Sequence, residues 1–208
     1  PLRLVGSEMC IRDSPDVSVS LHQGSPDQVA RMVIEEVAEI GMATESLANY
    51  PELVTLPCYE WQHVLVMPRE HPLASAKQIG LARLAEHPLV TYHPSFTGRS
   101  RIDLAFEKQG LKPRIALEAI DSDVIKTYVG LGMGIGIVAE MAVRDGLPDT
   151  LVSRPAGALF GSNMTRVAFK KGSYLRHFVL EFAQMLSERL NRELVLKALE
   201  GRSTDYEL

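Results

Sequence analysis

The stretch that most constrains the fold runs from residue 96 to residue 140 and reads FTGRSRIDLAFEKQGLKPRIALEAIDSDVIKTYVGLGMGIGIVAE. It holds two helical segments, and each begins with side chains able to cap a helix: Thr97 or Ser100 for the first, Asp121 or Ser122 for the second. Such side chains accept hydrogen bonds from the free N–H groups of the first turn. A strand separates the helices, and a glycine-rich turn leads into an apolar strand. This alternation predicts an α/β fold with a ligand pocket.

Periodicity within this stretch supports the same elements. Ile102, Ala105 and Phe106 share one helix face. Gly110 stands where a residue in the left-handed conformation would end that helix. Alternation over residues 113–119 predicts a half-buried strand. The second helix carries its apolar stripe at Val124, Ile125, Tyr128 and Val129.

A first strand–helix–strand unit is expected upstream of this stretch. It begins with an alternating strand at 17–21, continues with a helix that the capping box Ser25 to Gln28 opens and that runs to Ile40, and ends with a strand at 41–44. Polar residues that follow strands gather at the carboxyl edge of an α/β sheet. We therefore expect residues 23–25 and 44–46 at the ligand edge.

The remaining segments predict further strands and helices. Two apolar runs within residues 53–67 are separated by CYEWQ, and Pro57 and Pro68 mark strand edges or crossings. Ser173 is expected to cap a long helix that runs to about Leu190, with a break at Asn191. The other expected elements are a helix at 79–86, strands at 89–92, 151–152 and 165–169, and a continuing helix at 194–199.

Composition excludes several classes of protein. The 208 residues carry a formal charge of −4 and scattered Lys and Arg, so this chain lacks the basic stripe that contact with the DNA backbone requires. No apolar run approaches the length of a membrane-spanning helix. The two cysteines, Cys10 and Cys58, form no CxxC pair, which fits a reducing cytoplasm. We expect Cys58 to be a small buried side chain, with a reactive thiol as the alternative.

The sequence offers no evident catalytic, metal or cofactor site. Glycines at every second position from 130 to 136 do not form GxGxxG, and they follow a helix rather than a strand, so close backbone packing is the preferred interpretation. No GxSxG motif occurs. No metal-ligand spacing is found among the histidines, which are His22, His63, His71, His87, His93 and His177. We expect no catalytic residue, no metal and no cofactor.

Hydroxyl groups at helix starts and strand ends are the candidates for binding an anion. Ser25, Thr44, Thr97 and Ser100 stand where backbone N–H groups and the helix dipole attract negative charge. For each of them, capping alone is an alternative. Taken together they favour a cleft, because two α/β units would each contribute a helix start to it. From geometry we assign Ser25, Gly98 and Ser100 to this site.

Several motifs together resemble the effector-binding region of LysR-type transcriptional regulators, within that family the CysB-like and Cbl-like members. The motifs are LHQGSPDQ, ATESL, LPCYEW, EHPLA, TGRSRID and DSDVIKTYVGLGMGIGIVAE. The similarity runs from about Val17 to about Leu190. Cys58 and Tyr59 resemble CysB more closely, whereas GRSRID and DSDVIKTYV occur in a Cbl-like form.

The resemblance implies a fold and a domain division. It implies two Rossmann-like α/β subdomains of periplasmic-binding-protein type II architecture, joined by two crossing strands. Subdomain I would hold residues 15–57 and 161–190, and subdomain II residues 58–160. Residues 191–208 would form a C-terminal helix and a frayed tail. Residues 1–14 look like translated adapter sequence, so we exclude them from the fold.

The resemblance also implies a function. Thr44 and Thr97 would contact a small anion between the subdomains, with Trp61 as a nearby wall. The anion would be sulfate, O-acetylserine or N-acetylserine, and the regulated genes those of cysteine biosynthesis and sulfur assimilation. DNA would be bound only through an N-terminal helix-turn-helix missing from this chain, in a cytoplasmic homo-oligomer, a dimer or tetramer.

Two other functions stay open at this point. A periplasmic-type solute-binding protein shares the two-lobed architecture, and a signal peptide upstream would support it. An enzyme that uses an anion is the third interpretation, but no residue here supplies evident turnover chemistry.

Overall fold

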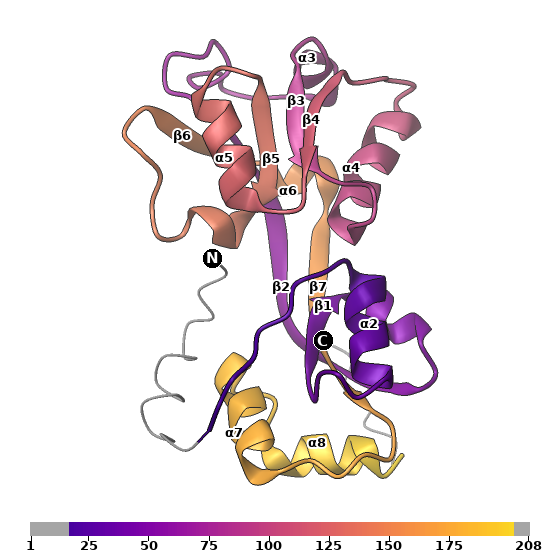
Figure 1. Cartoon of the computed structure of the whole chain (residues 1–208). Helices are drawn as coiled ribbons and strands as arrows, with labels where there is room; N and C mark the ends of the chain where they lie inside the picture. Colours follow the sequence, from indigo (N-terminus) through magenta and orange to yellow (C-terminus); the bar gives the residue numbers. More distant parts are fainter. Residues whose placement is uncertain (1–16, 202–208) are drawn as a thin grey trace. The chain divides into compact units, whose positions relative to one another are not determined.

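The computed structural model describes residues 17–201, which form two compact units. Unit 1 contains residues 17–59 and 164–201, and unit 2 contains residues 60–163. The chain passes between them twice, within strands β2 (Leu53–Pro68) and β7 (Ser162–Lys170) (Figure 1). The segment 1–14 and nearly all of the expected frayed tail lie outside the described residues.

Unit 1 is built on the paired strands β1 (Gly41–Thr44) and β7, which run antiparallel, with β2 next to β7. Side chains alternate across β7: Ala168 packs with helix α2 (Pro26–Ile34) and the short 3₁₀ helix η1 (Glu45–Asn49). Val167 and Phe169 pack instead with helices α7 (His177–Leu186) and α8 (Arg192–Leu199). This period of two gives unit 1 one core on each side of its strands.

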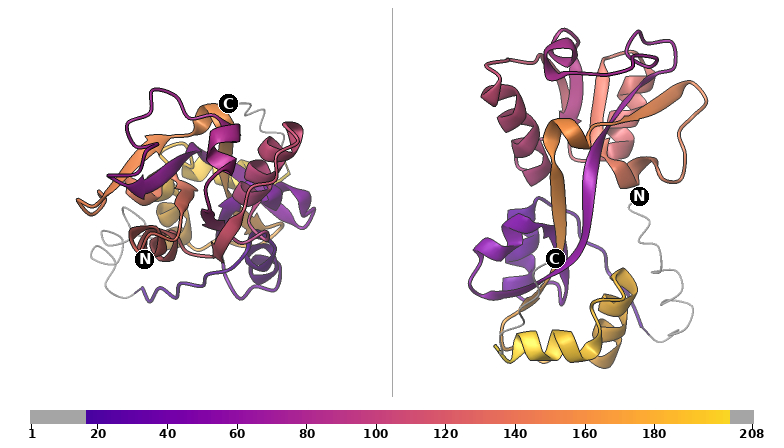
Figure 2. Two further views of the ribbon diagram at one scale, coloured as in Figure 1. Left: turned by 90° about the horizontal axis from the view of Figure 1, so that it is seen from above. Right: turned by 180° about the vertical axis from the view of Figure 1, so that it is seen from behind.

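Unit 2 contains the strand order β2, β5 (Ile135–Ala139), β3 (Leu89–Tyr92), β4 (Ile115–Ala119), and β6 (Leu151–Pro155) also pairs with β2. Strand β3 is parallel to both β4 and β5. Helix α4 (Thr97–Lys108) connects β3 to β4, and helix α5 (Ser122–Gly130) connects β4 to β5. Right-handed crossovers in opposite directions place the two helices on opposite sides of the strands, as Figures 1 and 2 show.

Each side of the unit 2 sheet has its own core. On one side Ile102 and Phe106 of α4 pack with Leu65 of β2, and on the other Ile125 of α5 packs with Val64. The short elements of this unit are α3 (Leu81–Ala85), η2 (Glu140–Val143) and α6 (Gly157–Phe160). Along residues 17–201, no helix is both long and apolar enough to cross a membrane.

Most local signals are confirmed by the structure. Ser25 and Gln28 form the expected reciprocal capping box at the start of α2. Asp121 caps α5 by accepting a hydrogen bond from the backbone N of Asp123 at 2.6 Å. Gly110 has a φ of 67° just beyond α4. The helix is interrupted before Asn191 as expected, and Asn191 also caps α8, its Oδ1 accepting a hydrogen bond from the backbone N of Leu194.

Several expectations are wrong. Residues 17–21 form no strand, and α2 ends at Ile34 rather than at Ile40. The alternation at 17–21 has no described strand beside it to supply hydrogen bonds, and Leu21 is 64% exposed. The two apolar runs in 53–67 belong to one strand, β2, which passes between the units, as one of the interpretations of Pro57 and Pro68 allowed. Ser173 does not cap α7, because Arg176 is the N-cap and the Ser173 hydroxyl donates to the carbonyl of Lys170.

Candidate functional site

The six predicted site residues divide between the two units. Ser25 and Thr44 belong to unit 1, and the other four, Trp61, Thr97, Gly98 and Ser100, belong to unit 2. Within unit 2 the structure brings Trp61 against the start of α4, where the remaining three lie.

The two unit 1 hydroxyls have local roles. Ser25 is half-buried, and its Oγ accepts the capping hydrogen bond from the backbone N of Gln28 at 3.4 Å. Thr44 ends β1 and stands at the N-cap position of η1, with its Oγ1 3.5 Å from Oγ of Ser46. Ser25 is thus accounted for by capping, the alternative considered for each hydroxyl.

Helix α4 begins without the side-chain cap that the sequence suggested. Phe96 is its N-cap, and Thr97 is its first residue, so in the described structure no cap side chain bonds to the first turn. Thr97 is half-buried, Gly98 is buried and Ser100 is exposed. The N–H groups and dipole of a helix that starts in this way attract an acceptor, which an anion can supply.

Arg99 fastens this helix start to the sheet. Its Nη1 donates to the carbonyl of Tyr92 at 2.9 Å and to Oε1 of Glu118 at 2.7 Å, and its Nε lies 2.7 Å from Oδ1 of Asp103. The side chain is 8% exposed. Asp103 and Glu118 balance its charge, so Arg99 holds the first turn in place rather than offering a free cation.

Tyr92 joins the strand ends next to this turn. Its hydroxyl accepts a hydrogen bond from the backbone N of Ala139 at 2.9 Å and lies 2.7 Å from Oγ of Ser122. Burial raises the pKa of Tyr92. The ends of β3 and β5 and the start of α5 are therefore held together at the carboxyl edge of the sheet, where α/β folds bind ligands.

His63 of β2 lies beneath the start of α4. Its ring packs edge-on against Trp61, with centroids 5.1 Å apart, and against Phe160 at 5.6 Å. A methyl group added to Gly98 would lie 3.1 Å from Nε2 of His63 and 3.2 Å from Cη2 of Trp61. The absence of a side chain at Gly98 thus lets the imidazole and the indole approach the helix backbone.

The imidazole of His63 is neutral and fully buried. Burial, and secondarily the charge of Arg101, lowers its pKa to about 4. Nδ2 of Asn163 lies 3.5 Å from Nδ1 of His63. With the Asn163 amide oriented as it is in the structure, its N–H donates to Nδ1, and this orientation leaves the ring proton on Nε2. Among residues 17–201, Nε2 of His63 has no hydrogen-bond partner, and neither has Oδ1 of Asn163.

In the sequence, His63 was considered only as a possible metal ligand. A sequence signal existed: in a strand, residues two apart share a face, so Trp61, His63 and Leu65 point to the same side of β2. All three are buried, whereas Gln62 between them is exposed. The packing of α4 over that face cannot be read from β2 alone.

This arrangement is suited to binding rather than to turnover. It offers a helix start, the hydroxyl of Thr97 and a neutral N–H donor, all of which favour an oxygen acceptor on a ligand. In the part of the chain that the structure describes, no group of three or more His, Cys, Asp or Glu residues is placed to hold a metal ion.

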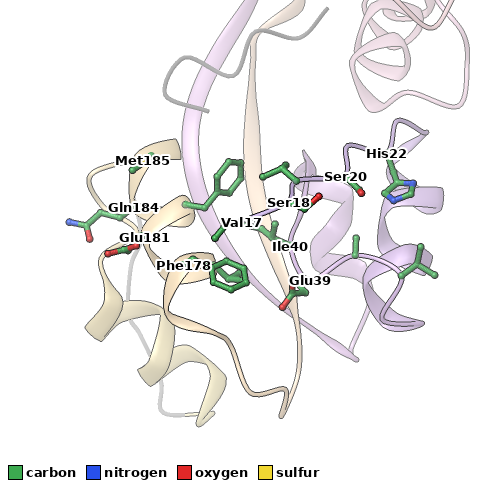
Figure 3. A pocket seen from close by; sticks show the side chains of 15 residues that line it. Val17, Ser18, Ser20, His22, Glu39, Ile40, Phe178, Glu181, Gln184 and Met185 are labelled. Atoms are coloured by element: carbon green, nitrogen blue, oxygen red, sulfur yellow. The ribbon is translucent and has the colours of Figure 1, made fainter. Parts of the chain in front are cut away.

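A separate hollow of about 740 Å³ lies in unit 1. Figure 3 shows its walls, formed by residues 17–22, by residues 37–40 and by α7. Its carboxylates, Glu39 and Glu181, pair with Arg176 and His177. Of the described residues that line it, none belongs to the predicted site, and its acidic side chains do not favour an anion.

Comparison with known proteins places the chain in a family. The family model described as the LysR substrate binding domain matches residues 9–191. The HTH-type transcriptional regulator CysB of Burkholderia cenocepacia is 50% identical over 194 residues, which cover 93% of this chain and 62% of that protein. The HTH-type transcriptional regulator SsuR of the same organism is 46% identical over 177 residues, covering 85% of this chain and 58% of SsuR.

A solved structure agrees with the sequence relatives. The cofactor-binding domain of the Cbl transcriptional regulator matches with a TM-score of 0.86 at 38% identity, covering 95% of this chain and 88% of that one. This likeness confirms the expected α/β architecture of periplasmic-binding-protein type II. The chain spans about three fifths of the length of CysB and SsuR. Because the family model matches most of its residues, the chain belongs to the LysR substrate-binding domain family.

Proposed function

We propose that this chain is the effector-binding part of a CysB-like transcriptional regulator and that it binds a small anion at the start of α4. One observation carries the proposal: helix α4 begins without a side-chain cap in the described structure, directly above the buried N–H donor of His63 and beside Trp61. Thr97 would contribute its hydroxyl, with Gly98 and Ser100 in the same turn. The predicted contributions of Thr44 and Ser25, which belong to unit 1, stay part of the proposal.

The expected affinity suits a metabolite sensor. Hydrogen bonds to a charged group are each worth about 1.5–3 kcal/mol before ordering and desolvation costs. Three or four of them leave a net binding free energy of roughly −4 to −8 kcal/mol, which corresponds to about millimolar to micromolar dissociation constants. A site in that range responds when the concentration of its ligand changes.

The names of the relatives suggest the effector and its biological setting. We propose sulfate, O-acetylserine or N-acetylserine as the anion, and genes of cysteine biosynthesis and sulfur assimilation as the targets. The relatives are HTH-type regulators, and this chain has a net charge of −4, so we assign DNA binding to another part of the protein. The working form would be a cytoplasmic homo-oligomer in which effector binding shifts the population of conformations.

The domain division remains part of the proposal. Subdomain I would hold residues 15–57 with 161–190, subdomain II residues 58–160, and residues 191–208 would follow as a C-terminal helix and tail. The two compact units and the continuity of β2 and β7 between them support such a division.

Calorimetric titration with sulfate, O-acetylserine and N-acetylserine tests the proposal. We expect saturable binding of at least one of them, weakened about tenfold or more by Thr97→Ala, which corresponds to the loss of one hydrogen bond to a charged group. Thr127→Ala is the matched control, because Thr127 is an exposed threonine of α5 whose hydroxyl bonds within its own helix. A folded chain that binds none of the three anions would contradict the proposed effectors.

A further inference from the structure

The Nε2–H group of His63 is a donor whose position calls for an explanation. His63 is fully buried, and within the described part of the chain no acceptor lies within hydrogen-bonding distance of its Nε2. Buried polar groups in native proteins nearly always have a partner, because leaving one unpaired is costly. The atom faces Gly98 in the first turn of α4, which is the turn proposed to hold the anion.

We propose that His63 determines effector specificity by donating its Nε2–H to an oxygen of the bound anion. This inference rests on the proposed function, since it requires an anion at the start of α4. The chemistry recognised is an unprotonated oxyanion oxygen, which sulfate and the carboxylate of an acetylserine share. Asn163 is the positioning residue, because its amide directs the ring proton to Nε2.

Gly98 and Trp61 control access to this donor. A side chain at residue 98 would stand between Nε2 and the helix backbone, since its first carbon would already lie 3.1 Å from that nitrogen. Trp61 is 7% exposed, and its Cη2 borders the same space. An oxygen therefore reaches Nε2 only when the indole or the first turn shifts, so binding is coupled to a movement of one of the two.

The neutrality of the donor gives the site a particular selectivity. His63 adds a hydrogen bond without adding positive charge. The site therefore discriminates between anions by the position of an oxygen atom more than by their total negative charge. Chloride, which has no oxygen to place, would gain little from it. Oxyanions held by the first turn of α4 would gain most.

Two substitutions in the 208-residue chain test the role of the donor. His63→Phe keeps a ring of similar size and removes the donor, whereas His63→Gln retains an N–H donor. In titrations with sodium sulfate and with N-acetylserine, we expect His63→Phe to bind about tenfold or more weakly than the wild type. His63→Gln should recover most of that loss. The anion whose binding is weakened more by His63→Phe is the one that uses the donor.

Each outcome decides the inference. Wild-type chain that binds neither anion overturns the proposed effectors and this inference together. Normal binding by His63→Phe overturns the role of His63 and leaves the anion site standing. Equal weakening by both variants, with both shown to be folded by circular dichroism, reduces His63 to a packing residue.

Nuclear magnetic resonance of the imidazole gives an independent readout that also serves if His63→Phe does not fold. In wild-type chain labelled with nitrogen-15, we expect the Nε2–H tautomer without ligand and a downfield shift of that proton when sulfate or N-acetylserine is added. A Nε2–H resonance that saturating anion leaves unmoved would overturn the inference.

Discussion

Gly98 and His63 lie so close that a methyl group added to the glycine would sit 3.1 Å from the imidazole Nε2. The first turn of α4 and strand β2 therefore approach each other closely at these two residues. Gly98 has no side chain, and His63 is fully buried. The shape and the hydrogen-bonding capacity of the candidate site both depend on this contact.

Gly98→Ala should weaken anion binding by about tenfold or more, because the methyl group displaces the imidazole or the indole of Trp61. Calorimetric titration with sulfate measures the change. Gly130→Ala is the matched control: Gly130 ends α5, and within the described residues nothing lies within 4 Å of the methyl group that this change would add. The control should bind normally, and equal weakening in both variants would count against the contact.

Arg99→Met should lower the free energy of unfolding by about 2–3 kcal/mol, because it removes charge-assisted hydrogen bonds from a buried side chain and leaves the Tyr92 carbonyl without that donor. Urea denaturation followed by circular dichroism measures it. Arg114→Met, at an exposed arginine just before β4, should change stability by less than about 0.5 kcal/mol. Similar losses in the two variants would show that Arg99 does not fasten α4.

The neutral state of His63 should make stability fall in mild acid. Its folded pKa of about 4 lies below its ordinary value of 6.5, so between those values the unfolded chain binds a proton that the folded chain does not. The contribution of His63 to stability is therefore largest above pH 6.5, and about 2 kcal/mol of it is lost between pH 7 and pH 5. His63→Gln should remove that part of the slope. Parallel slopes for the two proteins would place the pKa of His63 near its ordinary value.

Cys58 should resist thiol reagents. Burial raises its pKa to about 11, and its Sγ lies 3.5 Å from the carbonyl oxygen of Leu186. In a Cys10→Ser variant, Cys58 should react with Ellman's reagent at pH 8 about a hundredfold or more slowly than free cysteine, because so little thiolate is present. In urea the same thiol should react at an ordinary rate. Fast labelling of the folded chain would support the alternative of a reactive sensor.

Signals confined to a few neighbouring residues predicted the structure well. The capping box at Ser25 and the cap at Asp121 are confirmed, because a cap and the N–H group that it binds lie two or three residues apart. The same holds for Gly110, whose positive φ a glycine accommodates without strain.

Signals that depend on distant partners predicted it poorly. The alternation at 17–21 gives the spacing of a strand but says nothing about a neighbour, and no described strand pairs with it. His63 belongs to the candidate site only because α4, more than thirty residues further along the chain, packs over β2. Whether Thr97 and Thr44 contact the effector stays a prediction.

Trp61 is the only tryptophan in the 208 residues, and its indole borders the start of α4. Light absorbed at the red edge of the protein spectrum is therefore emitted from one place, and that place is the candidate site. Fluorescence excited at that edge reports on the surroundings of Trp61, so the unlabelled chain carries its own optical probe for a ligand that arrives at this helix start.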